Sequence, residues 1–478
     1  MLGIRETTAI NLRLVFLVLF FLTIFFELPT ASAQQNFYDK DLLPSSFHKQ
    51  RREALRALLP PNTCVILFSN PVRNRTNNVD FQFIQDPDLY YLTGLTEPHA
   101  ALLLFSDPVL ISGRKMNEVL FVQDRDPANE LWNGKRLGIE GAVKIIGIST
   151  VFLNKEFAAI LPVMGGFDNV WVKFPVDIKQ TAKGSGTLNS MVTDLNTKLT
   201  ESGKESQSQQ LKKAMATLRE IKLPEEVVLM QKAVDITIAG FQEAIRAIAP
   251  GMTEYQAQAI VEYYFKHNGS EYPGYNSISG GGINGCVLHY VTNRKTLTGN
   301  DMLLMDMGAE YHGYTADITR TVPVDGTFST EEKAIYELVL NAQLEGIAKA
   351  VDGNAFHDPH NAALEIIGKG LVDLGIIEDA NQVKKYFMHG TSHYLGLEVH
   401  DAGNFGKLRP GMVITVEPGI YIPEGSECDK KWWNIGVRVE DDVLITDSEP
   451  FVMSEALVKT VEAIEALMQE ESFFTKVK

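Results

Sequence analysis

Cysteine is scarce in this sequence, and the few that occur exclude two kinds of architecture. The 478 residues include only Cys64, Cys286 and Cys428, which are widely spaced and odd in number. They allow one internal disulfide at most, so the chain is not a disulfide scaffold, and the absence of Cys-x-x-Cys excludes a thiolate zinc site. With 45% apolar and 22% charged residues, the composition is that of a globular protein with two or three domains.

Positive charge is also in short supply. Lys and Arg number 44 against 60 Asp and Glu, which gives a net charge of -16. This balance repels phosphate backbones and anionic membrane surfaces, so we expect no nucleic-acid partner. The sequence also lacks Gly-x-Ser-x-Gly, His-Glu-x-x-His and a phosphate-binding loop that ends in Gly-Lys-Ser/Thr.

Long apolar runs are confined to the first residues. Arg5 and Arg13 precede the 13-residue run Leu14–Phe26, and the small residues Ala31-Ser32-Ala33 follow it. This pattern predicts a signal peptide over residues 1–33 and export to the periplasm or the medium, with no stable membrane span after cleavage. The run is shorter than the roughly 20 residues that cross a bilayer. The alternative is an uncleaved signal that tethers the protein to the membrane.

From about Phe47 to Val176 the sequence alternates short β-rich runs with polar turns and helix-like stretches, which predicts an α/β domain. The expected strands are 64–68, 90–95, 100–105, 118–123 and 170–174, with a helix at 49–59. Hydrophobic density drops in the polar segment that follows, and we place the domain boundary within residues 205–222.

Residues 211–478 carry strong helix signals. Pro224-Glu225-Glu226 opens a helix to about Ile248, and Thr253 with Gln256 forms a capping box for a second helix to about His267. Further helices are expected at 329–351, 360–374 and 454–471.

The strands between these helices contain acidic residues in apolar surroundings. If the hairpin around Tyr311-His312-Gly313 centres between Tyr311 and His312, Asp306 and Asp317 face each other with Cβ atoms about 5 Å apart. Carboxylates at that distance repel unless a proton or a cation lies between them. A solvated hairpin face is the alternative.

Two further acids, Glu417 and Glu440, each interrupt an alternating apolar run. A salt bridge from Arg438, two residues before Glu440, is one explanation for the second. A segment nearby, Met388–Asp401, holds three of the ten histidines. Four carboxylates and one imidazole without a thiol favour two divalent ions such as Mn(II) or Co(II), or less specifically Zn(II).

Four motifs, in this order, resemble the pita-bread metallopeptidases, a family that includes aminopeptidase P, prolidase and methionine aminopeptidase. They are MDMGAEYHGYTADITRT (305–321), HGTSHYLGLEVHD (389–401), TVEPGIYI (415–422) and RVEDDV (438–443). Residues 73–95 are in addition similar to the amino-terminal domain of aminopeptidase P. The resemblance implies an α/β (α+β) protein: a creatinase-like α/β domain over 34–210, then a pita-bread domain over 211–478 with a curved, largely antiparallel sheet covered by helices.

The resemblance also implies the roles of individual residues. The implied metal ligands are Asp306, Asp317, His393, Glu417 and Glu440, which would hold two divalent ions, Mn(II) first, with Co(II) or Zn(II) as alternatives. The implied catalytic residues are Glu417 as the proton shuttle, with His289 and His400. The implied substrate-binding residues are His289, His389, His400 and Arg438, although His389 has a structural role as its alternative.

The activity implied is hydrolysis of the bond between an amino-terminal residue and a following proline, by a hydroxide that bridges the two metals. The partners are then peptides with proline at the second position, and the family resemblance implies a homo-oligomer, a dimer or a tetramer. Two alternatives stay open: a prolidase that cleaves Xaa-Pro dipeptides with the same metal cage, and a non-catalytic scaffold of the same fold that only binds peptides.

Overall fold

The computed structural model describes residues 40–176 and 184–474. All elements named below belong to one compact unit, residues 43–478. The predicted signal peptide, residues 1–33, lies outside the described residues. Within the described part of the chain, no helix combines the length and apolar character needed to cross a bilayer. The predicted domain division between residues 210 and 211 stays a prediction.

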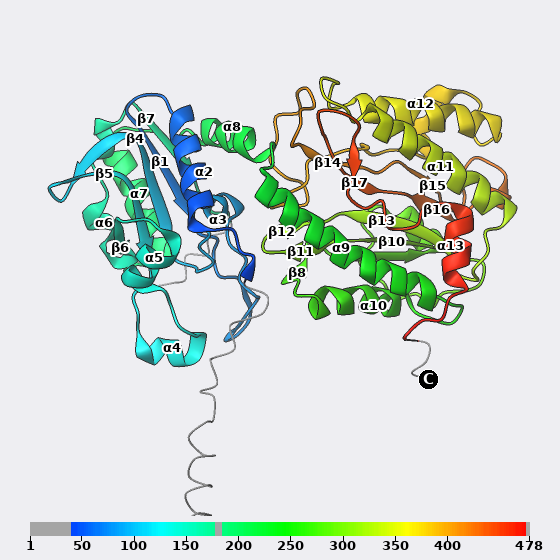
Figure 1. Ribbon diagram of the computed structural model, residues 1–478, viewed down its shortest axis with the longest axis horizontal. Helices are drawn as coiled ribbons and strands as arrows, with labels where there is room; N and C mark the ends of the chain where they lie inside the picture. Colours follow the sequence, from blue (N-terminus) through cyan, green and yellow to red (C-terminus); the bar gives the residue numbers. More distant parts are fainter. Residues whose placement is uncertain (1–39, 177–183, 475–478) are drawn as a thin grey trace, which may run out of the picture. The chain divides into compact units, whose positions relative to one another are not determined.

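The first part of this unit is built on a five-stranded sheet in the order β6-β5-β4-β1-β7. The strands are β1 (Thr63–Phe68), β4 (Ala101–Ile111), β5 (Arg114–Val122), β6 (Val151–Leu153) and β7 (Asn169–Lys173). Strand β1, which lies between β4 and β7, is buried on both faces. Val65 and Leu67 pack in a core with α2 (Ser45–Leu58), whereas Ile66 packs on the other side with α7 (Leu188–Glu201) (Figure 1).

Four of the five strands expected here are confirmed, and the fifth is wrong. Residues 90–95 do not form a strand, because Pro87–Thr93 is the helix α3. The Asp86 carboxylate caps this helix by accepting a hydrogen bond from Leu89 N at 3.0 Å, and Gly94, with φ 69°, ends it. The aromatic run therefore follows its helix-capping signals rather than its β propensity.

Helix α8 (Ser208–Arg219) packs on the five-stranded part, because Leu211 and Met215 lie in the same core as Val65. The α-helices that follow in the described residues are α9 (Pro224–Ala247), α10 (Glu254–His267), α11 (Thr330–Lys349), α12 (Asp358–Asp373) and α13 (Val461–Met468). The helices expected at 224–248, 253–267, 329–351 and 360–374 are confirmed. The last helix is shorter than the predicted 454–471, because Thr460 caps it by accepting from Ala463 N.

The strands of this part pair antiparallel throughout, in short sheets. They are β8 (Tyr272–Pro273), β9 (Ile278–Gly281), β10 (Met302–Met307), β11 (Ala309–Tyr311), β12 (Tyr314–Thr315), β13 (Ile318–Pro323), β14 (Val413–Val416), β15 (Gly419–Ile422), β16 (Ile435–Arg438), β17 (Asp441–Leu444) and β18 (Phe451–Val452). An isolated bridge between Thr319 and Glu440 joins two of these sheets. Helices α9 to α13 cover the strands in Figure 1, and their apolar faces share one large core with β10.

Candidate active site

One cavity of about 470 Å³ gathers every residue predicted for the site from separate segments of the chain. Its lining includes Asp306, Asp317, His393, Glu417 and Glu440 together with His289, His389, His400 and Arg438. Tyr275 and several apolar side chains complete it. The five predicted metal ligands and the four other predicted residues therefore meet at one place.

The two aspartates meet in a different way from the one expected. Asp306 on β10 pairs with Thr319 on β13, not with Asp317, so the predicted register is wrong. The turn contains His312 and Gly313, with φ of 50° and 86°, and Tyr311 pairs with Tyr314 across it. Two consecutive residues with positive φ form a two-residue hairpin turn, which moves its centre one residue along from the predicted one.

Tyr275 brings the two aspartates together. Its hydroxyl lies 2.6 Å from Oδ1 of Asp306 and 2.6 Å from Oδ1 of Asp317. A phenol has one hydrogen to donate, so it cannot donate to both carboxylates at once, and a further positive charge is needed beside them. Burial, followed by the charge of Asp306, raises the pKa of Tyr275 well above its usual value. The sequence analysis missed this residue, which precedes β9 in a segment without a distinctive pattern.

His393 supplies a nitrogen toward the same point. Its Nδ1 lies 3.0 Å from the carbonyl oxygen of Tyr394, which leaves Nε2 facing the carboxylates. Nε2 is 3.3 Å from Oδ2 of Asp317 and 3.7 Å from Oε1 of Glu417. Ligand atoms of Asp317, His393 and Glu440 all lie within 4.8 Å of one another, an arrangement that can hold a metal ion.

The carboxylates of the cavity carry more negative charge than the surrounding protein balances. Burial raises the pKa of Glu417 to about 7, and it raises that of Glu440 well above the usual value, with Asp317 adding to the effect. The pKa of Asp306 also rises through burial, against the opposing effect of Arg438. Burial lowers the pKa of His393, but Asp317 and Glu417 outweigh it and raise the value to about 9. This donor set fits divalent cations.

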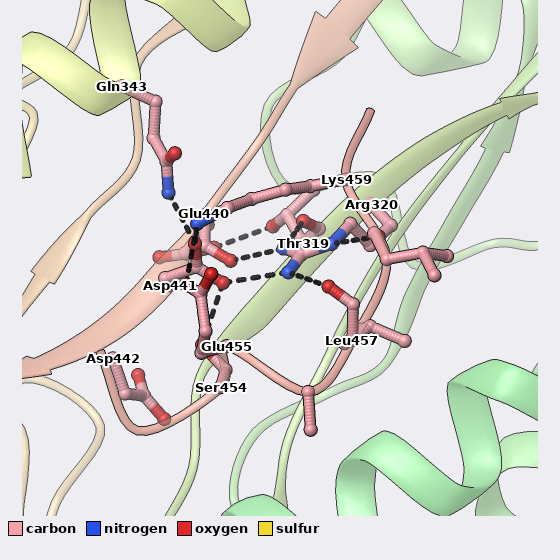
Figure 2. Close-up of polar contacts among 12 residues, drawn as sticks. Thr319, Arg320, Gln343, Glu440, Asp441, Asp442, Ser454, Glu455, Leu457 and Lys459 are labelled. Atoms are coloured by element: carbon pink, nitrogen blue, oxygen red, sulfur yellow. Dashed lines mark hydrogen bonds and ion pairs between the residues drawn. The ribbon is translucent and has the colours of Figure 1, made fainter. Parts of the chain in front are cut away.

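Glu440 accepts hydrogen bonds from a buried polar cluster that lies outside the cavity lining (Figure 2). The Thr319 hydroxyl donates to Oε2 of Glu440 at 2.6 Å, and Nη1 of Arg320 donates to its carbonyl oxygen at 2.7 Å. Arg320 is itself paired with the fully buried Asp441. Asp442, the residue after Asp441, accepts a hydrogen bond from Asp317 N at its Oδ2 atom, at 3.1 Å. The backbone around two predicted metal ligands, Asp317 and Glu440, is thus held by side chains outside the cavity.

Arg438 contacts Asp306 rather than Glu440, so the salt bridge considered for Glu440 is not the one formed. Its Nη2 forms an ion pair with Asp306, and its Nη1 donates to the Tyr421 hydroxyl at 2.8 Å. Nε2 of His389 lies 2.8 Å from the same hydroxyl. Burial, with a smaller effect from Arg438, lowers the pKa of His389 to about 4, so this ring is neutral at neutral pH. The strand alternation 417, 419, 421 places Tyr421 on the Glu417 side, a signal that the sequence analysis did not use.

His289 and His400 approach the cavity from two loops. His289 follows the 3₁₀ helix Gly282–Cys286 and is exposed. The His400 ring centroid is 4.4 Å from that of His393, and burial, followed by the charge of His393, lowers the pKa of His400. The next residue, Asp401, is buried and accepts from Nζ of Lys222 at 3.0 Å.

A buried arginine links this loop to the first part of the unit. Arg219, at the end of α8, forms ion pairs with Asp401 and with Oδ1 of Asp88, the latter at 2.7 Å. Asp88 lies on α3 and also contacts Nζ of Lys173 on β7 at 2.6 Å. The backbone next to His400 is therefore connected to the five-stranded sheet through three ion pairs in series.

Comparisons with known proteins agree with this geometry. Residues 228–447 match the model of metallopeptidase family M24, and residues 48–171 match that of the aminopeptidase P N-terminal domain. The chain is 36% identical to the Xaa-Pro aminopeptidase of Haemophilus influenzae over 438 residues, which is 89% of this chain and 98% of that protein.

The chain is also similar to solved structures of bacterial aminopeptidases P. Aminopeptidase PepP of Pseudomonas aeruginosa is 35% identical, with a TM-score of 0.79. Aminopeptidase P of Escherichia coli with the inhibitor Pro-Leu is 32% identical, with a TM-score of 0.80. Both matches cover 89% of this chain and 98% of the other.

Proposed function

Since the chain belongs to metallopeptidase family M24, in its aminopeptidase P branch, and is a metal-dependent exopeptidase, we propose that it releases an amino-terminal residue that precedes proline. The observation that carries this proposal is the single cavity in which four carboxylates and one imidazole converge. The names of the relatives favour this activity over that of a prolidase.

The predicted ligands Asp306, Asp317, His393, Glu417 and Glu440 are the residues that would hold the cations. When bound, two divalent cations supply Lewis-acid polarisation of the scissile carbonyl and activation of water near neutral pH. The Glu417 carboxylate, which lines the cavity, can accept a proton and pass it to the departing nitrogen.

Side chains at the cavity wall suit the rest of the substrate. His289 and His400 can donate hydrogen bonds to a peptide carbonyl. Leu288, Val291 and Val399 form an apolar lining. Such a lining suits a proline ring, and the bond before proline has no N–H that an enzyme could hold.

We further propose Mn(II) as the native metal, with Co(II) or Zn(II) as alternatives, because an oxygen-rich donor set favours hard ions. The family resemblance supports a homo-oligomer, a dimer or a tetramer. The sequence pattern of residues 1–33 supports export through a signal peptide, with membrane tethering by an uncleaved signal as its alternative.

The activity can be tested with chelator-treated protein that is reloaded with Mn(II) and given Arg-Pro-Pro or Xaa-Pro dipeptides. We expect release of arginine from Arg-Pro-Pro, detected by mass spectrometry. Asp317→Asn should retain less than about 1% of the rate, since even loss of an outer partner of a ligand costs about 10- to 100-fold. Cleavage of dipeptides alone would favour a prolidase, and protein that cannot be loaded with metal would favour the scaffold.

A further inference from the structure

The loop that carries His289 has little regular structure of its own. It runs from Gly282 to Arg294, and after the 3₁₀ helix Gly282–Cys286 the structure assigns no helix or strand to residues 287–294. Val287, His289 and Val291 are exposed. Loops of this kind need support from side chains if they are to hold a residue at a fixed position. We name residues 282–294 the His289 loop.

One buried carboxylate supplies that support. Glu254 is 0% exposed, and its two oxygens accept four hydrogen bonds. Oε1 accepts from Gly281 N and from Nδ2 of Asn284, each at 2.8 Å. Oε2 accepts from the Tyr290 hydroxyl at 2.9 Å and from Lys295 N at 2.8 Å. Two of the four donors, Gly281 and Lys295, flank the His289 loop at its two ends. The other two, Asn284 and Tyr290, lie within the loop, and Tyr290 directly follows His289.

The backbone of Glu254 adds to this arrangement. Its N–H donates to the carbonyl oxygen of Lys295 at 3.0 Å, and its carbonyl oxygen accepts from the Ser279 hydroxyl at 2.9 Å. The start of α10 does not depend on the Glu254 side chain, because Gln256 accepts from Thr253 N in the capping box. Within the described residues, all four hydrogen bonds that the Glu254 carboxylate accepts therefore come from the His289 loop and its two flanking residues.

We propose that Glu254 is a positioning residue that acts through Tyr290 and the His289 loop to hold His289 at the cavity. The proposal rests on the proposed function in one respect, since His289 must touch the substrate for its position to matter. Glu254 itself does not line the cavity.

Glu254→Gln is the sharpest perturbation because it keeps the shape of the side chain. An amide offers only one acceptor oxygen, so its NH₂ group must face two of the four donors. Neither Gly281 N nor Lys295 N can become an acceptor, so one of these two N–H groups loses its partner. Glu243→Gln is a matched control: Glu243 is a buried helical glutamate that accepts from the Ser472 hydroxyl at 2.7 Å and Phe473 N at 2.6 Å, outside this loop.

The test is a double-mutant cycle of Glu254→Gln and His289→Ala, with kcat and KM measured on Arg-Pro-Pro at equal metal content. In the parent, Glu254→Gln should lower kcat/KM by about ten- to a hundredfold. In the His289→Ala background the same change should have less than about a twofold effect, and Glu243→Gln should have none in either. Equal losses in both backgrounds, or no loss in the parent, would overturn the proposal.

Hydrogen exchange separates this proposal from the activity itself. Amides of residues 284–292 should exchange faster in Glu254→Gln than in Glu243→Gln, whether or not the parent cleaves the peptide. A parent without peptidase activity contradicts the proposed function, whereas unchanged exchange contradicts the role of Glu254. If Glu254→Gln does not fold, Tyr290→Phe enters the same cycle, since it removes one donor to the carboxylate, and additive effects with His289→Ala then refute the proposal.

Discussion

Asp441→Asn should lower the free energy of unfolding by about 3–5 kcal/mol, the usual cost of breaking a buried ion pair by removing one partner. The Asp441 carboxylate is fully buried and accepts from Nη2 of Arg320, Nε2 of Gln343 and the Ser454 hydroxyl, each at 2.7 Å. It also accepts from Nζ of Lys459 at 2.8 Å. Figure 2 shows these donors around one acid. Asparagine would leave two cations beside a neutral group.

Lys459 offers a matched control within the same cluster. Its Nζ also lies 3.3 Å from Oε2 of Glu455, whose side chain is 70% exposed. Glu455→Gln removes the same charge from the same lysine, yet we expect a loss of less than about 1 kcal/mol because water screens an exposed pair. The difference between the two variants therefore reflects the burial of Asp441 together with its larger number of partners.

Unfolding in guanidinium chloride, followed by circular dichroism, measures both changes. The proteins should be stripped of metal, because a cation that binds only the folded state would add its own stabilisation. Burial acts to raise the pKa of Asp441, but Arg320 and Lys459 outweigh it and hold the pKa well below the usual value for an aspartate. The stabilisation by this charge is thus present above about pH 4 and is lost as the pH falls further, so the variant and its parent should converge in acid. Losses for Asp441→Asn and Glu455→Gln within 1 kcal/mol of each other would refute the reasoning.

Two further outcomes follow from buried groups. Tyr275→Phe should weaken metal binding by about 10- to 100-fold in chelator competition, because it removes the hydroxyl that joins Asp306 and Asp317; unchanged affinity would contradict this role. His48, with Nδ1 2.9 Å from the Tyr91 carbonyl oxygen, has its pKa lowered by burial to about 4. Below about pH 6.5 the unfolded chain binds a proton at His48 before the folded protein does, so the free energy of unfolding falls by up to about 3 kcal/mol between about pH 6.5 and pH 4. In denaturant titrations, the free energy of unfolding of His48→Gln should therefore depend less on pH over this range than that of the parent.

The sequence predicted the membership of the site better than its geometry. Acids inside apolar runs, such as Glu417 and Glu440, are unusual enough to be recognised without a structure, because burial of a charge requires a partner. The particular partner is set by tertiary packing. Arg438 pairs with Asp306, far away in the sequence, rather than with Glu440 two residues on. Tyr275 joins two acids of other strands through such packing and leaves no local pattern.

The errors in the fold have local causes. Residues 90–95 are aromatic and apolar, which favours a strand, but the Asp86-Pro87 start and the Gly94 end are stronger helix signals. The predicted hairpin register is one residue off because His312 adopts a positive φ, which histidine tolerates better than most residues. In both places the misjudged signal was a single backbone conformation at the end of an element, which hydrophobic periodicity does not report.

The ion pairs of Arg219 constrain how the first part of this protein could be exchanged for that of another protein. Asp88 belongs to the five-stranded part, and Asp401 sits beside His400, so one guanidinium group serves both. A chimera that exchanged the first 200 residues for those of another protein would have to carry an acid at the position of Asp88. Without that acid, Arg219 would keep its ion pair with Asp401 but lose the one with Asp88. We then expect the main disturbance at His400, next to Asp401, rather than at the point where the two sequences are joined.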